Sequence, residues 1–207
     1  IKRWLEFRRV LFRSQRKFPN TRLRRLRRNN NLINLVSETN LTKDDLIQPV
    51  FVKENFDGEE EIESMPNIYR YGLNQALNEI EDIIKSGINS LAIFPVIDSE
   101  NKDHKGSQAT KTNNFISKSI KEIKRQFPDL VLIADVALDP YTDHGHDGII
   151  VNGDVDNDET NKILIEQSLI LADAGADIIA PSDMMDGRIG LIREALESQN
   201  LDRKSVV

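Results

Sequence analysis

The sequence predicts an α/β fold built on a parallel sheet, and two observations carry that prediction. One pattern occurs twice in similar sequence: the end of a helix, a glycine, a short apolar strand and a polar loop. The two copies are KSGINSLAIFP from Lys85 and DAGADIIAPS from Asp173. Such alternation implies parallel strands joined by right-handed crossovers. No GxGxxG or GxxxxGKS/T phosphate loop follows any predicted strand, which favours a closed barrel over an open, nucleotide-binding sheet.

The first predicted strand covers residues 46–52, LIQPVFV. Apolar residues then recur at helical spacing from Leu73 to Ile84 and stop before Gly87, a usual residue just past a helix C-terminus. The segment 90–96, SLAIFPV, is a continuous apolar run, which predicts a strand covered on both faces.

The rest of the chain repeats this unit. The chemistry of a parallel barrel lies where its strands end. Asp135 and Ser182 each follow an apolar strand, so they are the first candidates for functional residues. The further predicted elements are helix 116–127, strand 130–134, helix 159–174, strand 177–180 and helix 189–196.

The composition indicates one soluble globular domain, because 39% of the 207 residues are hydrophobic and 30% are charged. No stretch reaches the ~18 consecutive apolar residues of a membrane span, and the N-terminus lacks the apolar run of a signal peptide. We therefore expect a cytoplasmic protein with no membrane partner. The absence of cysteine excludes disulfides and thiolate metal sites, so any metal must be held by oxygen or imidazole ligands.

Charge is distributed unevenly along the chain. Residues 1–28 hold twelve Lys or Arg and one Glu, whereas the remainder holds sixteen basic and thirty-three acidic residues. A basic segment of this kind fits nucleic acid, an acidic membrane surface or an acidic partner subunit.

Both ends carry short peptides that look like translated sequencing-adapter DNA, VLFRS at 10–14 and DRKSVV at 202–207. We interpret 1–14 and 202–207 as translation scars, and natural variable tails are the alternative. This interpretation leaves a basic arm at 15–40 and a partial barrel at 41–201. It also weakens the case for nucleic-acid binding, because part of the basic segment is set aside.

An acidic loop follows the predicted strand 130–134. Nine acidic residues and no Lys or Arg lie between Arg125 and Lys162. Four aspartates of this region are spaced by four, but Pro140, Gly145 and Gly148 exclude a helix. Crowded carboxylates repel one another unless a cation or a buried lysine lies among them, and hard oxygen ligands suit Mg²⁺. The alternative is a solvated acidic loop with no specific role.

His144 and His146 lie on the same loop and could contribute to a transition-metal site. Their spacing favours the alternative, in which both histidines are solvent-exposed or locally hydrogen-bonded. The aspartates at 154, 156 and 158 imitate the start of an EF-hand, but Glu159 stands where that loop needs glycine. We expect these aspartates to cap the following helix instead.

The loop 135–148, DVALDPYTDHGHDG, is similar to the metal-site and active-site loop of porphobilinogen synthases, also called 5-aminolaevulinate dehydratases. The resemblance implies a (β/α)8 TIM barrel, which usually takes about 250 residues, truncated here after about five strands behind an extended N-terminal arm. Four further stretches follow in the order of that family, namely TRLRRLRRN at 21–29, IQPVFV at 47–52 with SMP at 64–66, VDNDET at 155–160 and APSDMMDGRI at 180–189.

The resemblance also assigns roles to single residues. Zinc-dependent members have three cysteines where Ala137, Asp139 and Asp147 stand here, so a three-cysteine zinc site is impossible and Mg²⁺ is implied as activator. Asp139 and Asp147 would line the pocket, with a metal-binding role as a further possibility. Asp135 would orient and deprotonate a Schiff-base lysine, and Ser182 would donate a hydrogen bond to substrate. Asp183 matches a position linked through water to the activating Mg²⁺.

The implied reaction condenses two 5-aminolaevulinate molecules to porphobilinogen with loss of two waters. Its two imine lysines, its lid and its Mg²⁺-binding glutamate are all expected beyond Leu201, so we expect this chain to be inactive and marginally stable as a monomer. The lysines that remain, such as Lys102 and Lys105, lie in a polar loop where no feature of the sequence lowers their pKa.

The resemblance implies a homo-oligomer, octameric in the full-length protein, in which the arm lies on a neighbouring subunit rather than on nucleic acid. Two other readings remain open at this point. One is a different Schiff-base barrel enzyme of the class I aldolase kind, and the other is a non-catalytic module for metal binding or assembly. The arginines assigned to the assembly arm are Arg22, Arg24, Arg25, Arg27 and Arg28.

Overall fold

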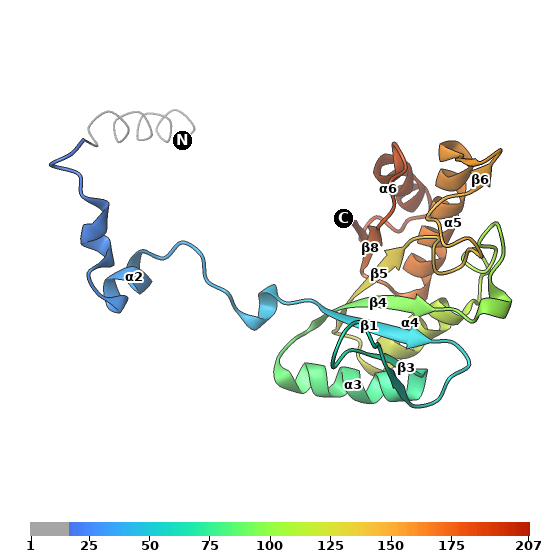
Figure 1. The fold of residues 1–207 in the computed structure, drawn as a ribbon, viewed down its shortest axis with the longest axis horizontal. Helices are drawn as coiled ribbons and strands as arrows, with labels where there is room; N and C mark the ends of the chain where they lie inside the picture. Colours follow the sequence, from blue (N-terminus) through green and yellow to red (C-terminus); the bar gives the residue numbers. More distant parts are fainter. Residues whose placement is uncertain (1–16) are drawn as a thin grey trace. The chain divides into compact units, whose positions relative to one another are not determined.

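The computed structural model describes residues 17–207 and divides into two units, with the boundary in the chain after Thr42 (Figure 1). We call residues 17–42 the arm and residues 43–207 the α/β unit, and each is described by itself. The segment 1–14, interpreted above as a translation scar, lies outside the described residues. No helix among residues 17–207 is long and apolar enough to cross a membrane.

The arm contains two short helical elements, η1 (Leu23–Arg27) and α2 (Asn30–Val36). The side chain of Asn29 caps α2 by accepting a hydrogen bond from the backbone nitrogen of Leu32 at 2.9 Å. None of the described arm residues is buried, and the exposed ones include the apolar residues Leu23, Leu26, Ile33, Leu35, Val36 and Leu41.

The α/β unit is built on one mixed, mostly parallel sheet in the order β2-β3-β1-β4-β5-β8-β9. All neighbours pair in parallel except β2, which runs antiparallel to β3. The row does not close into a barrel. Its strands are β1 (Gln48–Lys53), β2 (Glu59–Glu61), β3 (Tyr69–Tyr71), β4 (Ser90–Val96), β5 (Val131–Val136), β8 (Ile178–Pro181) and β9 (Ser205–Val206). A separate hairpin consists of β6 (Ile150–Val151) and β7 (Asp154–Val155).

Helices join the parallel strands, as the alternating pattern predicts (Figure 1). The α-helices are α3 (Leu73–Ser86), α4 (Phe115–Gln126), α5 (Asn157–Ala174) and α6 (Arg188–Ser198), and two short 3-10 turns are η2 (Lys43–Asp45) and η3 (Ser99–Asn101). Helices α3 and α5 end at Gly87 and Gly175, whose φ angles of 95° and 118° are left-handed and favour glycine. Both helix ends confirm the prediction. Asp156 caps α5 by accepting from the backbone nitrogens of Asp158 and Glu159, which confirms the capping role for this aspartate.

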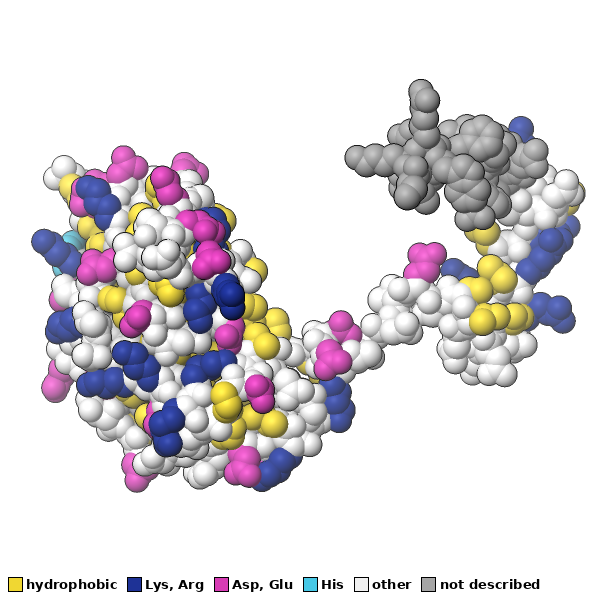
Figure 2. Space-filling model, turned by 180° about the vertical axis from the view of Figure 1, so that it is seen from behind, with side chains coloured by type: hydrophobic (Ala, Val, Ile, Leu, Met, Phe, Trp, Pro, Cys, Tyr) yellow, Lys and Arg dark blue, Asp and Glu magenta, His cyan; other side chains and the backbone are white. Residues whose placement is uncertain are grey.

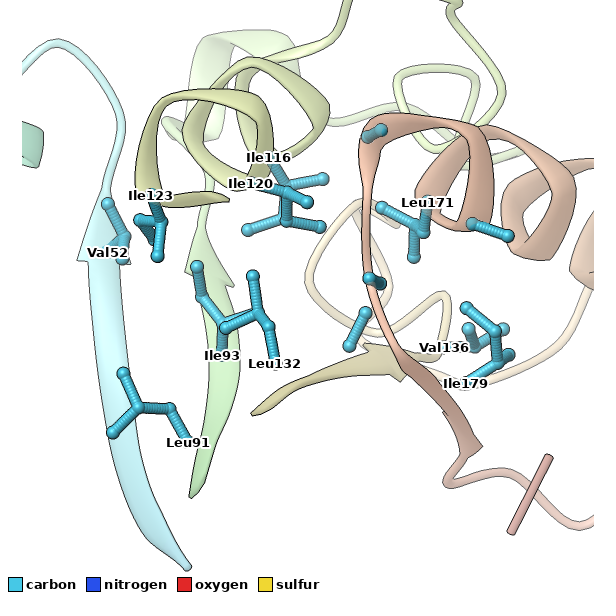
Figure 3. Close-up of a cluster of buried hydrophobic side chains, with 14 of the residues drawn as sticks. Val52, Leu91, Ile93, Ile116, Ile120, Ile123, Leu132, Val136, Leu171 and Ile179 are labelled. Carbon is cyan, nitrogen blue, oxygen red and sulfur yellow. The ribbon is translucent and has the colours of Figure 1, made fainter. Parts of the chain in front are cut away.

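The core lies between the sheet and its helices (Figure 3). In β4, Leu91 and Ile93 are buried, and Ile120 of α4 belongs to the same core. Alternate residues of β4 on the other face, including Phe94, are only half-buried. The prediction that 90–96 is covered on both faces is therefore wrong for this chain, because an unclosed sheet leaves its inner face without opposing strands.

Two element boundaries also differ from prediction. Strand β5 extends to Val136, so Asp135 lies within the strand rather than just past it. The segment 202–207 contains β9, which pairs with β8 and extends the parallel row. The interpretation of this segment as a translation scar stays a prediction.

Candidate active site

A cavity of about 610 Å³ opens on the half-buried face of the α/β unit, near the carboxyl ends of β1, β4, β5 and β8. Phe51 and Phe94 from adjacent strands line this cavity, and their rings stack with centroids 5.3 Å apart. Polar side chains also line it, and they include Asp135, Asp139, Asp147 and Ser182. The structure thus brings four of the predicted site residues into one cavity.

Asp135 and Ser182 lie at the same end of the sheet, as their positions in the sequence predict. Parallel pairing of β5 with β8 sets Val136 opposite Pro181, and the next residue is Ser182. The Ser182 hydroxyl donates to the Asp135 carboxylate, with 2.6 Å between Oγ and Oδ1. This short bond holds the hydroxyl and the carboxylate against each other at the cavity wall.

The environment of Asp135 raises its pKa from 3.8 to about 6. Burial is the main cause, the hydrogen bond from Ser182 acts in the opposite direction, and the charges of Asp139 and Asp147 raise the pKa further. A carboxyl group with a pKa just below neutrality is mostly ionised at pH 7 and still basic enough to accept a proton. Asp135 is therefore suited to act as a general base.

Asp139 and Lys102 line the same cavity and interact through their charges. Burial and the charge of Asp147 raise the pKa of Asp139, while the charge of Lys102 opposes that rise. Lys102 follows η3 in the loop after β4 and lines the same cavity. Sequence reasoning placed Lys102 in a polar loop and missed its position beside the acidic loop. The order of the strands could have predicted this position, because the loops after neighbouring parallel strands meet at one edge of the sheet.

Asp183 lies apart from the cavity lining. Its side chain is fully buried, Oδ1 accepts a hydrogen bond from the backbone nitrogen of Met185 at 2.7 Å, and Oδ2 lies 3.0 Å from the Arg188 Nε. Among residues 17–207, Asp139, Asp147 and Asp183 do not form a group of three ligand atoms close enough to hold one ion. Asp183 stabilises the turn before α6 in this chain.

The acidic loop is fastened to its surroundings by hydrogen bonds. Gln167 of α5 donates to the Ala137 carbonyl at 3.2 Å, and the Thr142 hydroxyl donates to the His146 carbonyl at 3.0 Å. His144 and His146 each accept a bond through Nδ1, from the backbone nitrogens of His146 and Gly148 respectively. The prediction that both histidines are locally hydrogen-bonded is confirmed.

The five arm arginines are all exposed. Arg22 donates to the Pro19 carbonyl at 3.1 Å and lies 4.7 Å from the centroid of the Phe18 ring, and Arg25 donates to the Asn20 carbonyl at 3.0 Å. These contacts are all within the arm, so the guanidinium groups stay accessible to other molecules.

Comparison with known proteins decides the family. The profile of the family described as delta-aminolevulinic acid dehydratase matches residues 20–207. The delta-aminolevulinic acid dehydratase of Methanothermus sociabilis is 47% identical over 186 residues, which are 90% of this chain and 57% of that protein. The one from Chlamydia pneumoniae is 46% identical, with 90% and 56% covered.

The chain belongs to the delta-aminolevulinic acid dehydratase family. A crystal structure of the Toxoplasma gondii family member, solved with the reaction product porphobilinogen, superposes with a TM-score of 0.86 at 37% identity, over 90% of this chain and 53% of that one. This match identifies the open parallel row as part of the barrel of a delta-aminolevulinic acid dehydratase. The chain spans about half the length of the curated relatives it matches.

Proposed function

We propose that the protein to which this chain belongs is a porphobilinogen synthase that condenses two 5-aminolaevulinate molecules to porphobilinogen with loss of two waters. The Asp135–Ser182 pair carries the proposal, because it sets a general base with a pKa of about 6 beside a hydroxyl in an open cavity. Membership of the dehydratase family supports it, as does the porphobilinogen bound to the Toxoplasma gondii relative.

Each cavity residue has a role in this proposal. Asp135 accepts a proton during imine chemistry, and the Ser182 hydroxyl, which donates to Asp135 in this structure, would donate to substrate instead once substrate binds. Asp139 and Asp147 place negative charge near the substrate amino group, which is cationic at neutral pH. The stacked Phe51 and Phe94 exclude water from the part of the cavity that they line.

The condensation also needs electrophilic activation of a ketone, which an imine with a lysine provides. We place both imine lysines in the half of the relatives that this chain does not match. Lys102 is the lysine of this chain that lines the cavity, and we assign it to balancing the charge of Asp139. The chain of 207 residues alone is then inactive.

The cation of this proposal is Mg²⁺, acting as an activator and not as a catalytic zinc. The support is chemical, because the chain has no thiolate and the cavity offers only carboxylate oxygens as anionic ligands. This Mg²⁺ would lie at a separate site of subunit contact, and its main ligand would come from the half of the relatives that this chain does not match. We expect EDTA to leave part of the activity of the complete protein and Mg²⁺ to restore the rest.

We further propose that the protein is a cytoplasmic homo-oligomer, an octamer when complete, and that Arg22, Arg24, Arg25, Arg27 and Arg28 contact a neighbouring subunit. The arm combines these cations with exposed apolar side chains (Figure 2). The rest of the chain is acidic, with thirty-three acidic and sixteen basic residues after Arg28, so a second copy offers the basic arm a surface of opposite charge. Removal of residues 17–28 from the complete protein should reduce its assembly size in light scattering.

The decisive test compares this chain with the complete reading frame. Pyrrole formation from 5-aminolaevulinate and imine trapping by borohydride should occur only with the complete protein. In that protein, Asp135→Asn should lower kcat at least about 100-fold, whereas Asp129→Asn at an exposed site should leave it unchanged. Turnover by the 207-residue chain, or a borohydride adduct on Lys102, would contradict the assignment of the lysines.

A further inference from the structure

We propose that His104, Asp143 and His144 form a binding site for one divalent transition-metal ion, outside the cavity described above. His104 lies in the loop after β4, and Asp143 and His144 lie in the acidic loop. These two loops also carry Lys102 and Asp139 of the cavity wall. Three ligating side chains from two separate segments therefore meet at one point on the surface.

The distances between the three side chains suit a shared ion. One ligand atom of each residue lies within 4.8 Å of the other two, and Nδ1 of His104 is 3.7 Å from Oδ1 of Asp143. The imidazole rings of His104 and His144 meet edge to face with centroids 4.9 Å apart. Ligand atoms of a tetrahedral zinc ion lie about 3.3 Å apart, given bonds of about 2.0 Å. Side-chain rotations that move the exposed ligand atoms by about 1 Å would bring them to this spacing without moving the backbone.

The backbone beneath the site is already fixed. An isolated parallel bridge pairs Asp103 with Thr142. His104 directly follows the first of these residues, and Asp143 and His144 directly follow the second. The backbone nitrogen of Asp103 donates to the Tyr141 carbonyl, and that of Asp143 donates to the Asp103 carbonyl, both at 3.2 Å. The Asp103 carboxylate also accepts from the backbone nitrogens of Lys105 and Ser107. Binding an ion therefore costs little further backbone entropy.

The ligand set determines the class of ion. Two imidazoles and one carboxylate suit Zn²⁺, Co²⁺, Ni²⁺ or Cu²⁺, whereas Mg²⁺ and Ca²⁺ prefer oxygen ligands alone. The remaining coordination positions would be filled by water, because the site is at the surface. This site therefore differs in chemistry from the carboxylates of the cavity, and its test does not depend on the proposed activity.

His144 has to exchange one contact when the ion binds. Its Nδ1 accepts from the backbone nitrogen of His146 at 3.1 Å, and its Nε2 lies 3.3 Å from the His104 carbonyl oxygen. Nδ1 becomes a ligand by giving up the bond from the His146 nitrogen, while Nε2 keeps its proton and its contact with the His104 carbonyl. A coordinate bond to the ion replaces that hydrogen bond.

An ion at this position would cross-link the two loops. The loop after β4 and the acidic loop would then open and close together, because His104 and Asp143 would share one ligand sphere. Hydrogen exchange of the amides near 103–106 and 142–146 should therefore slow when Zn²⁺ binds.

The test uses the untagged 207-residue chain, whose three histidines allow a complete scan. Competition with a chromophoric chelator should give one Zn²⁺ per chain, and Co²⁺ should give d–d absorption from nitrogen and oxygen ligands. His104→Ala and Asp143→Asn should each weaken Zn²⁺ affinity at least about tenfold, while far-UV circular dichroism of the variants stays unchanged, because both side chains are exposed.

The matched control is His146→Ala, which removes the third histidine without touching the proposed ligands. This variant should keep the affinity and stoichiometry of the unaltered chain. The proposal is overturned if the unaltered chain binds no Zn²⁺ below millimolar concentration. It is equally overturned if His146→Ala weakens binding as much as His104→Ala, or if Asp139→Asn does so, since the ion would then lie elsewhere on the acidic loop.

Discussion

In the α/β unit, helix α4 buries Ile116, Ile120 and Ile123 in the core (Figure 3). Helix α2 of the arm buries none of its residues and leaves Ile33, Leu35 and Val36 exposed (Figure 2). The difference shows what each helix needs in order to be stable. Helix α4 gains its stability from burial within its own chain. Helix α2 has only seven residues and an Asn29 cap, and helices of that length are marginal in water. The arm therefore needs a partner surface, whereas α4 finds its partner within the α/β unit.

The largest effect expected from this comparison is a loss of core packing. Ile120→Ala should lower the free energy of unfolding of the chain by about 3 kcal/mol, because Ile120 is fully buried and its truncation leaves a cavity. Leu35→Ala in the arm should change it by less than about 0.5 kcal/mol, because Leu35 is 79% exposed. Urea denaturation measures both, and equal losses would break the comparison.

The next effect concerns the open face of the α/β unit. The raised pKa of Asp135 means that its ionised form opposes folding, so stability is lost as pH rises from about 4 to about 6. Asp135→Asn keeps an oxygen that accepts from Ser182 and removes the charge. At pH 7 this variant should be more stable than the unaltered chain, by at most about 3 kcal/mol, and the difference should vanish below pH 4.

Urea denaturation at several pH values measures this difference, and Asp129→Asn serves as the matched control at an exposed position. If Asp135→Asn gains nothing at pH 7, the carboxylate is not desolvated and the general-base assignment loses its support. A gain that persists at pH 3.5 would point to packing rather than charge.

A smaller effect concerns Lys102. Its charge opposes the rise in the pKa of Asp139, so Lys102→Met should raise that pKa further. Carbon-detected NMR titration of the Asp139 carboxyl group measures the change. Lys105→Met is the control, because Lys105 is not a cause of the Asp139 shift and does not line the cavity. Equal shifts in both variants would show a general charge effect rather than a specific contact.

The smallest effect is expected from the arm. The free energy of unfolding of a chain that begins at Lys43 should lie within about 0.5 kcal/mol of that of the full chain, because no described arm residue is buried. A loss above about 1 kcal/mol would show that the arm stabilises its own α/β unit.

Local patterns predicted local structure well. Gly87 and Gly175 marked two helix ends because only a residue tolerant of positive φ continues the chain there. Asp135 and Ser182 were predicted to lie at the same end of the sheet, because parallel strands bring their carboxyl ends to one edge. Both inferences use information held within a few residues or within one repeated unit.

Long-range features were missed for the same reason. The burial of both faces of β4 depends on strands that would close the sheet, and the apolar run alone does not show whether they are present. Lys102 reaches the acidic loop, and His104 reaches Asp143, because a bridge joins Asp103 to Thr142. No periodicity or motif in the sequence marks that bridge.

The Asp103–Thr142 bridge also has a consequence for how these two loops change during evolution. The same two backbone segments carry residues of the cavity wall and of the proposed metal site. A substitution that shifts one segment therefore also shifts side chains on the other segment. Effects of substitutions at Lys102 or His104 should therefore be non-additive with those at Asp139 or Asp143. Among relatives, the two loops are expected to vary as a coupled pair.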